Sequence, residues 1–428
     1  MYQFIIAQCL LAMGVSCPTQ KFVQEVLTTW LTVRGRFNFA NLSRYSSWHE
    51  RTFRRGFARG FSWGEFNQRL LTTIVPVQHE LIAALDTSFV KKSGKHTAGL
   101  GMFFNGCAGR VEKGLELSLL SLIDVTAQTG YALWAWQTIA SAHSRKSSGK
   151  NSKSDRDKDK QPAKAQANAK KTEVDSRLDE CLRQVEKVRP LLPLKVRYLA
   201  VDGFYSCRKF VDGICALHLQ VVGKLRKDAS LVYPYRGPQK PRGRRRVYGE
   251  RVQWSNLDET HWQNEGELDK GVRLHSAVLH HKSLGRLVRV ALLQQQHSQG
   301  VSQVLLFSTD LSLSGRDMVR FYRARFPIEF LFRDAKGSLG LSHCQARNTK
   351  ALEFHWNAAF CALNVVKWQE ALRSSNSSKR RFSAASCKQR CSNERLLEVF
   401  SDRLGLDWTR IKSHPAYPEL CNYGAITP

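Results

Sequence analysis

Residues 322–336 read YRARFPIEFLFRDAK, a basic stretch in which one glutamate stands among large apolar side chains. Four polar residues in it follow one another at intervals of 3, 4 and 7: Tyr322, Arg325, Glu329 and Lys336. Those intervals place side chains on one face of an α-helix. The sequence therefore predicts a helix that begins near residue 316 and presents all four residues together. Pro327 within the stretch predicts a kink or a late helix start.

An ordinary surface helix with an Arg325–Glu329 ion pair, four residues apart, would account for part of this pattern. The apolar residues around the glutamate argue against that interpretation, because a surface helix is apolar on one side only. Phe326, Ile328 and Leu331 instead indicate a helix that is packed on most sides. A glutamate in such a helix is a candidate functional residue.

Two aspartates upstream each follow a short apolar run: Asp86 follows LIAAL and Asp202 follows VRYLAV. Runs of this length predict buried strands, each ending in a carboxylate. A single aspartate at a strand end is common for structural reasons, since Asp favours turns. Together with Glu329, however, the two aspartates supply three carboxylates. A divalent cation is the usual compensation for carboxylates that lie near a buried strand end.

The charge balance indicates a polyanionic partner. The 428 residues include 66 Lys and Arg against 36 Asp and Glu, which gives a formal net charge of +30. Solubility requires much less, whereas binding to DNA phosphates releases condensed counterions and is favoured by such an excess. The hydrophobic fraction of 42% suits a folded protein. No apolar run approaches the length of a membrane span, and we expect a cytoplasmic protein without membrane contact.

The cysteines and histidines do not predict a zinc site. Eleven cysteines are present, no CxxC pair occurs, and Cys387 and Cys391 have no matching pair nearby. Reduced thiols in a cytosolic protein are the simplest interpretation. His275, His280 and His281 lie in predicted strands, and we interpret them as structural.

Residues 1–75 are predicted to be helical and to bind DNA. Apolar residues at 39, 42 and 45 form one short helix face, Ser46-Ser47 interrupts it, and Trp48, Phe53 and Phe57 begin a second helix. Two short helices joined by a tight turn, the second of them basic, are typical of a helix-turn-helix. An ordinary solvated basic helix is the competing interpretation. The candidate DNA-binding residues of the second helix are Arg51, Arg54 and Arg55.

Composition divides the rest of the chain. Residues 76–218 contain strand candidates and a low-complexity insert at 141–175, which is predicted to be disordered because it has few large apolar side chains. Residues 219–312 are predicted to be mainly β and include the basic loop RGPQKPRGRRR, in which Arg244, Arg245 and Arg246 are candidate DNA contacts. Residues 313–372 return to helical spacing. Residues 373–428 are basic, with one helix predicted near 396–404.

The spacing Tyr322-x2-Arg325-x3-Glu329-x6-Lys336 resembles, without a gap, the YREK signature of the transposases of insertion-sequence family four. LDTSFVKKSGKHTAGLGMFFNGCAGRVEKG, at 85–114, looks like that family's region around its first aspartate, and VDGFYS, at 201–206, looks like the region around its second. The resemblance covers roughly residues 80–140, 195–225 and 300–366. It rests on motifs more than on continuous similarity.

The resemblance implies an α/β fold: an RNase H-like catalytic core, interrupted by a mainly β insertion and preceded by an all-α N-terminal DNA-binding region. It implies a DDE transposase that cuts double-stranded DNA at transposon ends and transfers the 3′-OH into target DNA by cut-and-paste transposition. Asp86, Asp202 and Glu329 would be catalytic and would bind Mg²⁺, or Mn²⁺ in its place. Tyr322, Arg325 and Lys336 would hold phosphates near the cut.

The resemblance further implies a homodimer in the synaptic complex, in the nucleoid of a bacterial cytoplasm. Some relatives carry a base-stacking Trp in the strand before the glutamate helix, but here that strand reads SQVLLFSTD. Either Trp254 or Trp262 would then stack on the flipped base, or base capture would work differently. The sequence therefore does not decide whether a hairpin intermediate forms. Two rivals remain: a catalytically inactive, transposase-derived DNA-binding regulator, and a stand-alone structure-specific nuclease.

Overall fold

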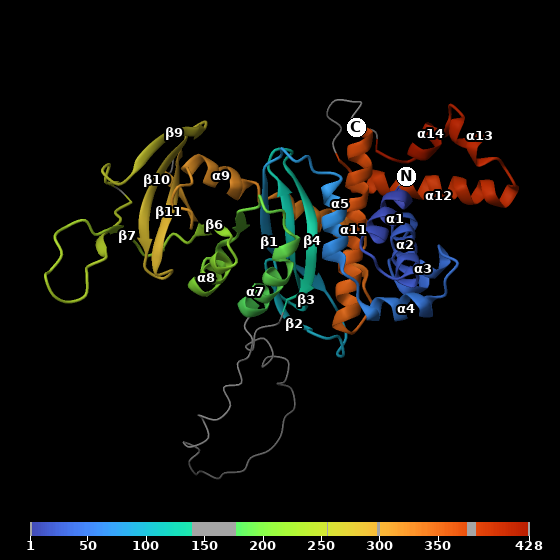
Figure 1. Cartoon of the computed structure of the whole chain (residues 1–428), viewed down its shortest axis with the longest axis horizontal. Coiled ribbons are helices and arrows are strands. Elements are labelled where there is room, and N and C mark those ends of the chain that lie inside the picture. Colours follow the sequence, from blue (N-terminus) through green and yellow to red (C-terminus); the bar gives the residue numbers. More distant parts are fainter. Residues whose placement is uncertain (1, 139–176, 255, 298–299, 375–381, 427–428) are drawn as a thin grey trace, which may run out of the picture.

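The computed structural model describes residues 2–138, 177–254, 256–297, 300–374 and 382–426 (Figure 1). The predicted disordered insert at 141–175 lies outside these residues. The described part is a mixed α/β chain with a large twelve-stranded sheet. None of its helices is long and apolar enough to cross a bilayer.

The sheet has the main strand order β2-β3-β1-β5-β6-β12-β11-β10-β7-β8, with β4 beside β3 and β9 beside β10. β1 is antiparallel to β3 and parallel to β5, and β5 is parallel to β6. The strand bounds are β1 Leu81–Lys91, β2 Gly101–Asn105, β3 Arg110–Asp124, β4 Thr129–Gln137, β5 Tyr198–Val201, β6 Gln220–Leu225, β7 Leu231–Pro234, β8 Tyr248–Arg251, β9 Gln263–Asp269, β10 Val272–His281, β11 Arg286–His297 and β12 Gly300–Ser308.

Most of the helices flank the β1–β6 half of this sheet (Figure 1). The first five precede it: α1 Tyr2–Ala12, α2 Cys17–Thr32, α3 Phe39–Arg44, α4 Glu50–Arg59 and α5 Trp63–Thr72. Two lie in the middle of the chain, α7 Arg177–Val188 and α8 Arg208–Ala216. The others follow the last strand: α9 Gly315–Arg323, α10 Pro327–Ser338, α11 Thr349–Ser374, α12 Ala384–Leu404, α13 Trp408–Ser413 and α14 Tyr417–Asn422.

The alternation of side chains along β1 separates two hydrophobic cores. Ile82 and Ala84 point into a core that also contains buried residues of α2, α10 and α11. Ala83 and Leu85 point to the other face, into a core built with α7 and α8. Because neighbouring residues of a strand face opposite sides, Asp86 lies on the same face as Ala84, toward α10.

The structure corrects three predictions about the elements. The predicted single helix is broken: α9 ends at Arg323, and α10 begins at Pro327, which occupies the first helical position. Proline fits there because the first helical N–H has no partner within the helix, so the predicted late start is confirmed. Asp86 lies in the middle of β1 rather than at its end, because β3 pairs with all eleven residues of that strand. The helix predicted near 396–404 is wrong in extent, since α12 runs from Ala384 to Leu404.

Candidate active site

The strand register brings Asp86 and Asp202 side by side. Ala84 on β1 pairs with Ala200 on β5 in a parallel ladder, and each aspartate stands two residues further along its own chain. Asp202 directly follows β5, and its side chain accepts a hydrogen bond from the backbone N–H of Phe204 at 3.0 Å. The two carboxylates therefore lie at one level of the sheet. Asp202 follows the end of its strand, as predicted, whereas Asp86 lies in the middle of β1.

Arg325 joins this pair to Glu329. Its Nη1 donates a hydrogen bond to Oδ2 of Asp86 at 2.6 Å, and its Nη2 donates to Oε1 of Glu329 at 3.0 Å. Arg325 lies between α9 and α10, where the chain turns, whereas Glu329 lies in the first turn of α10. The break between the helices thus lets one guanidinium reach β1 and α10 together.

The site holds more negative than positive charge. Burial raises the pKa of Asp86, and the neighbouring Asp202 carboxylate raises it further, while Arg325 and the N–H of Thr87 oppose the shift. Burial also works against the charge of Arg325, but the carboxylates of Asp86 and Glu329 outweigh it and raise the pKa of Arg325. Three carboxylates and one guanidinium leave an excess of two negative charges, which suits a divalent cation.

The donor chemistry of the three carboxylates fits Mg²⁺ or Mn²⁺, which prefer hard oxygen ligands. Within the described ranges, no three His, Cys, Asp or Glu side chains already form a group that could hold a metal ion. The guanidinium of Arg325 bridges Asp86 and Glu329 instead. Metal binding would therefore require Arg325 to yield at least one of these contacts.

Lys336 reaches the same strand further along. Its Nζ donates hydrogen bonds to Oγ of Ser88 and to the carbonyl of Phe89, both at 2.8 Å. Burial lowers the pKa of Lys336. The ring of Tyr322 lies 6.0 Å from the guanidinium carbon of Arg325, and burial raises the pKa of Tyr322. The four polar residues spaced at 3, 4 and 7 thus gather near β1, although they do not share one helix.

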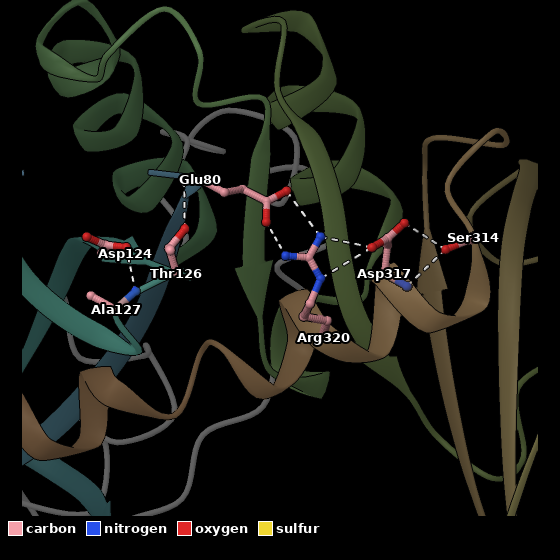
Figure 2. A network of polar contacts seen from close by, with 7 residues as sticks. All are labelled: Glu80, Asp124, Thr126, Ala127, Ser314, Asp317 and Arg320. Atoms are coloured by element: carbon pink, nitrogen blue, oxygen red, sulfur yellow. Dashed lines mark hydrogen bonds and ion pairs between the residues drawn. The ribbon is translucent and has the colours of Figure 1, made fainter. Parts of the chain in front are cut away.

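A polar network anchors α9 to the start of β1 (Figure 2). Arg320 stands between Glu80 and Asp317, with its Nη2 3.1 Å from Oε1 of Glu80 and 2.9 Å from Oδ1 of Asp317. Ser314 caps the helix by accepting from the N–H of Asp317 at 3.0 Å. The backbone N–H of Glu80 in turn donates to Oγ1 of Thr126 at 3.0 Å. Sequence reasoning missed Glu80 and Arg320, because only the fold brings residues 240 positions apart together.

The other candidate DNA-binding residues lie away from this site. Arg51, Arg54 and Arg55 belong to α4, whereas Arg244–Arg246 are exposed in the loop between β7 and β8. Figure 1 places that loop and α4 toward opposite ends of the molecule, with β1 between them. Of the two candidate stacking residues, Trp262 is buried and packs against Trp254, with ring centroids 6.2 Å apart.

Comparison with known proteins identifies the family of this chain. The family described as DDE superfamily endonuclease matches residues 7–283, about two thirds of the chain. The chain therefore belongs to the DDE superfamily endonucleases. The match includes Asp86 and Asp202 and ends before Glu329. Among solved structures, a piggyBac transposase synaptic complex with hairpin DNA aligns with a TM-score of 0.40 and 11% identity, over 94% of this chain and 74% of that one. No curated protein matches.

Proposed function

We propose that this protein is a DNA transposase that cleaves DNA at transposon ends and transfers the freed 3′-OH into target DNA by a cut-and-paste route. One observation carries the proposal. In a chain of the DDE superfamily endonucleases, Asp86 and Asp202 stand at one level of neighbouring parallel strands, and Arg325 links Asp86 to Glu329. These three carboxylates are the proposed metal ligands and catalytic residues.

The strand pairing supports an RNase H-like core for this transposase, that is, an antiparallel meander continued by parallel strands. β4, β3 and β1 form the antiparallel part, and β5 and β6 continue it in parallel with β1. The mainly β region at 219–312 begins with β6 itself and would continue the same sheet, since β6 pairs with β5 on one side and with β12 on the other. The proposed N-terminal DNA-binding region is 1–75, the second part of the core is 313–372, and 373–428 is a basic C-terminal region.

The proposed chemistry assigns a role to each charged residue at the site. Bound Mg²⁺ or Mn²⁺ would supply Lewis acidity toward a phosphodiester oxygen and lower the pKa of an attacking water. Asp86, Asp202 and Glu329 would hold it. Arg325 would then be free to donate to a phosphate oxygen in place of one of its carboxylate partners. Tyr322 and Lys336 would line the same path, in agreement with the resemblance to insertion-sequence family four.

A nicking experiment tests this function. The protein is incubated with Mg²⁺ and the DNA that flanks its own gene, and the nicks are mapped. Asp86→Asn, Asp202→Asn and Glu329→Gln should each abolish nicking and retain DNA binding. Asp228→Asn, at an exposed position in the loop after β6, is the matched control and should nick like the wild type.

The pattern of failure separates the rivals. DNA binding without cleavage by the wild type would favour the transposase-derived regulator over the proposal. Cleavage that depends on DNA structure and ignores the transposon ends would favour the stand-alone nuclease. Size measurement of the protein–DNA complex tests the proposed homodimer, since the synaptic complex would hold two chains.

A further inference from the structure

A strongly basic cavity of about 600 Å³ lies where β1 ends. Its walls are the loop at 92–97, the chain that follows the short helix η3 (Leu341–His343), and one residue from the N-terminal helical region. No carboxylate occurs among the lining residues. The cations that line it, here called the basic pocket, are Arg36, Lys91, Lys92, Lys95 and Arg347.

Within the parts of the chain that the structure describes, none of the salt bridges involves these five cations. Their mutual repulsion adds to the effect of burial on the pKa values of nearby groups. Burial lowers the pKa of Lys92, and the positive charge of Arg347 lowers it further. Burial and the charge of Arg36 also lower the pKa of His343. A gathering of like charges in a hollow is stabilised when an anion enters it.

The basic pocket is held together by hydrogen bonds that cross between its walls. The backbone N–H of Ala98 donates to the carbonyl of Arg347 at 2.8 Å, and the carbonyl of Ala98 accepts from Nε2 of Gln137 at 2.7 Å. Nζ of Lys92 also donates to the carbonyl of Cys344 across the cavity. The pocket is therefore formed before any ligand binds, which lowers the ordering cost of binding.

The position of the pocket points to its ligand. β1 runs from Asp86 past the Lys336 contacts at Ser88 and Phe89 to Lys91, so the pocket continues the line of the candidate active site. Five strand residues at about 3.3 Å each separate Asp86 from Lys91 by roughly 17 Å. One DNA strand rises about 3.4 Å per nucleotide, so this distance corresponds to about five nucleotides.

We propose that the basic pocket binds consecutive backbone phosphates of duplex DNA, about five nucleotides from the phosphodiester at Asp86. The spacing rests on the proposed function, since it takes Asp86 as the cleavage point. Five cations exceed what one free phosphate needs, and DNA offers several phosphates in a row. The pocket would thus fix the position of the duplex along β1 without reading its sequence.

Salt-dependent DNA binding tests the proposal. A short fluorescein-labelled duplex of random sequence is titrated in EDTA at several salt concentrations. The triple variant Lys91→Ala, Lys95→Ala, Arg347→Ala removes three exposed cations of the pocket. Each lost phosphate contact should make the slope of log K against log salt less negative by about 0.9. The matched control, Arg403→Ala, Arg410→Ala, Lys412→Ala, removes the same charge from the exposed C-terminal region and should change the slope less.

Equal slopes for the two triple variants would overturn the proposal, because net charge alone would then explain the loss. A pocket variant that binds DNA like the wild type but loses thermal stabilisation by inorganic phosphate would also overturn it, in favour of a small-anion site. Binding in EDTA requires no cleavage, so a protein that fails to nick DNA still tests the pocket. Once the nicks are mapped, the phosphates about five nucleotides from each nick can be replaced by neutral methylphosphonates. This replacement should weaken DNA binding by the wild type but not by the pocket variant.

Discussion

Replacing Arg325 by alanine should cost both stability and activity. The contact between Nη1 of Arg325 and Asp86 is charge-assisted, 2.6 Å long and mostly buried, with 14% and 20% of the two side chains exposed. Such a hydrogen bond contributes about 1.5–3 kcal/mol. The contact with Glu329 adds at most about 0.5 kcal/mol, because 45% of that side chain is exposed to solvent. Arg325→Ala should therefore lower the free energy of unfolding by about 1.5–3.5 kcal/mol near neutral pH.

The pH dependence of this loss makes the prediction sharper. Without Arg325, Asp86 would be a desolvated carboxylate without its cation, and it would take up a proton instead. The pKa of Asp86 is already raised by burial, and removal of the guanidinium should raise it further. The destabilisation should consequently shrink on acidification, because a protonated Asp86 no longer needs the cation.

Thermal unfolding and nicking rate, measured together over a pH series, check this reasoning. Arg325→Lys keeps the charge but cannot bridge two carboxylates with one planar group, so its stability should fall between wild type and Arg325→Ala. Arg333→Ala is the matched control on α10, since the Arg333 side chain is 66% exposed and, among the described residues, its ion pair is with its neighbour Asp334. An Arg325→Ala protein as stable as the wild type at neutral pH would refute the argument.

Three other perturbations have defined outcomes. The raised pKa of Asp86 means that the fold favours its protonated form. On acidification, nicking should therefore be lost at a higher pH than an ordinary aspartate would give, and before thermal stability falls. Loss of nicking and of thermal stability at the same pH would contradict this. Lys336→Met should keep or raise the melting temperature, because burial disfavours the lysine charge. If the lysine contacts a phosphate, the same variant should nick DNA about tenfold more slowly or worse. A fully active variant would exclude that role. Burial lowers the pKa of Lys367 to about 8 from 10.5, so between these pH values the unfolded chain binds one more proton at this residue, and the contribution of Lys367 to stability rises with pH. Compared with the wild type, Lys367→Met should therefore lose up to one proton from the slope of unfolding free energy against pH in that window, and identical slopes would contradict this.

The local pattern of the sequence predicted most elements of the sheet because strand and helix periodicities are short-range properties. The runs around Asp86 and Asp202 form β1 and β5, and Pro327 begins a helix, as a residue without an N–H favours. The same local reasoning failed where pairing partners matter. It placed Asp86 at a strand end because the apolar run stops there, whereas β3 extends the pairing to Lys91.

The sequence alone predicted the three carboxylates and the residues around Glu329 as candidate site residues, since residue type and spacing are local properties of the chain. It misjudged how they meet: constant helical spacing suggested one face of one helix, while the turn between α9 and α10 brings Arg325 to β1. The Glu80–Arg320 contact and the basic pocket were invisible to it. Both join segments that are hundreds of residues apart, and no local periodicity encodes such a contact. Only the parallel register of β1 and β5, set by packing of the whole sheet between two helical cores, puts Asp86 beside Asp202.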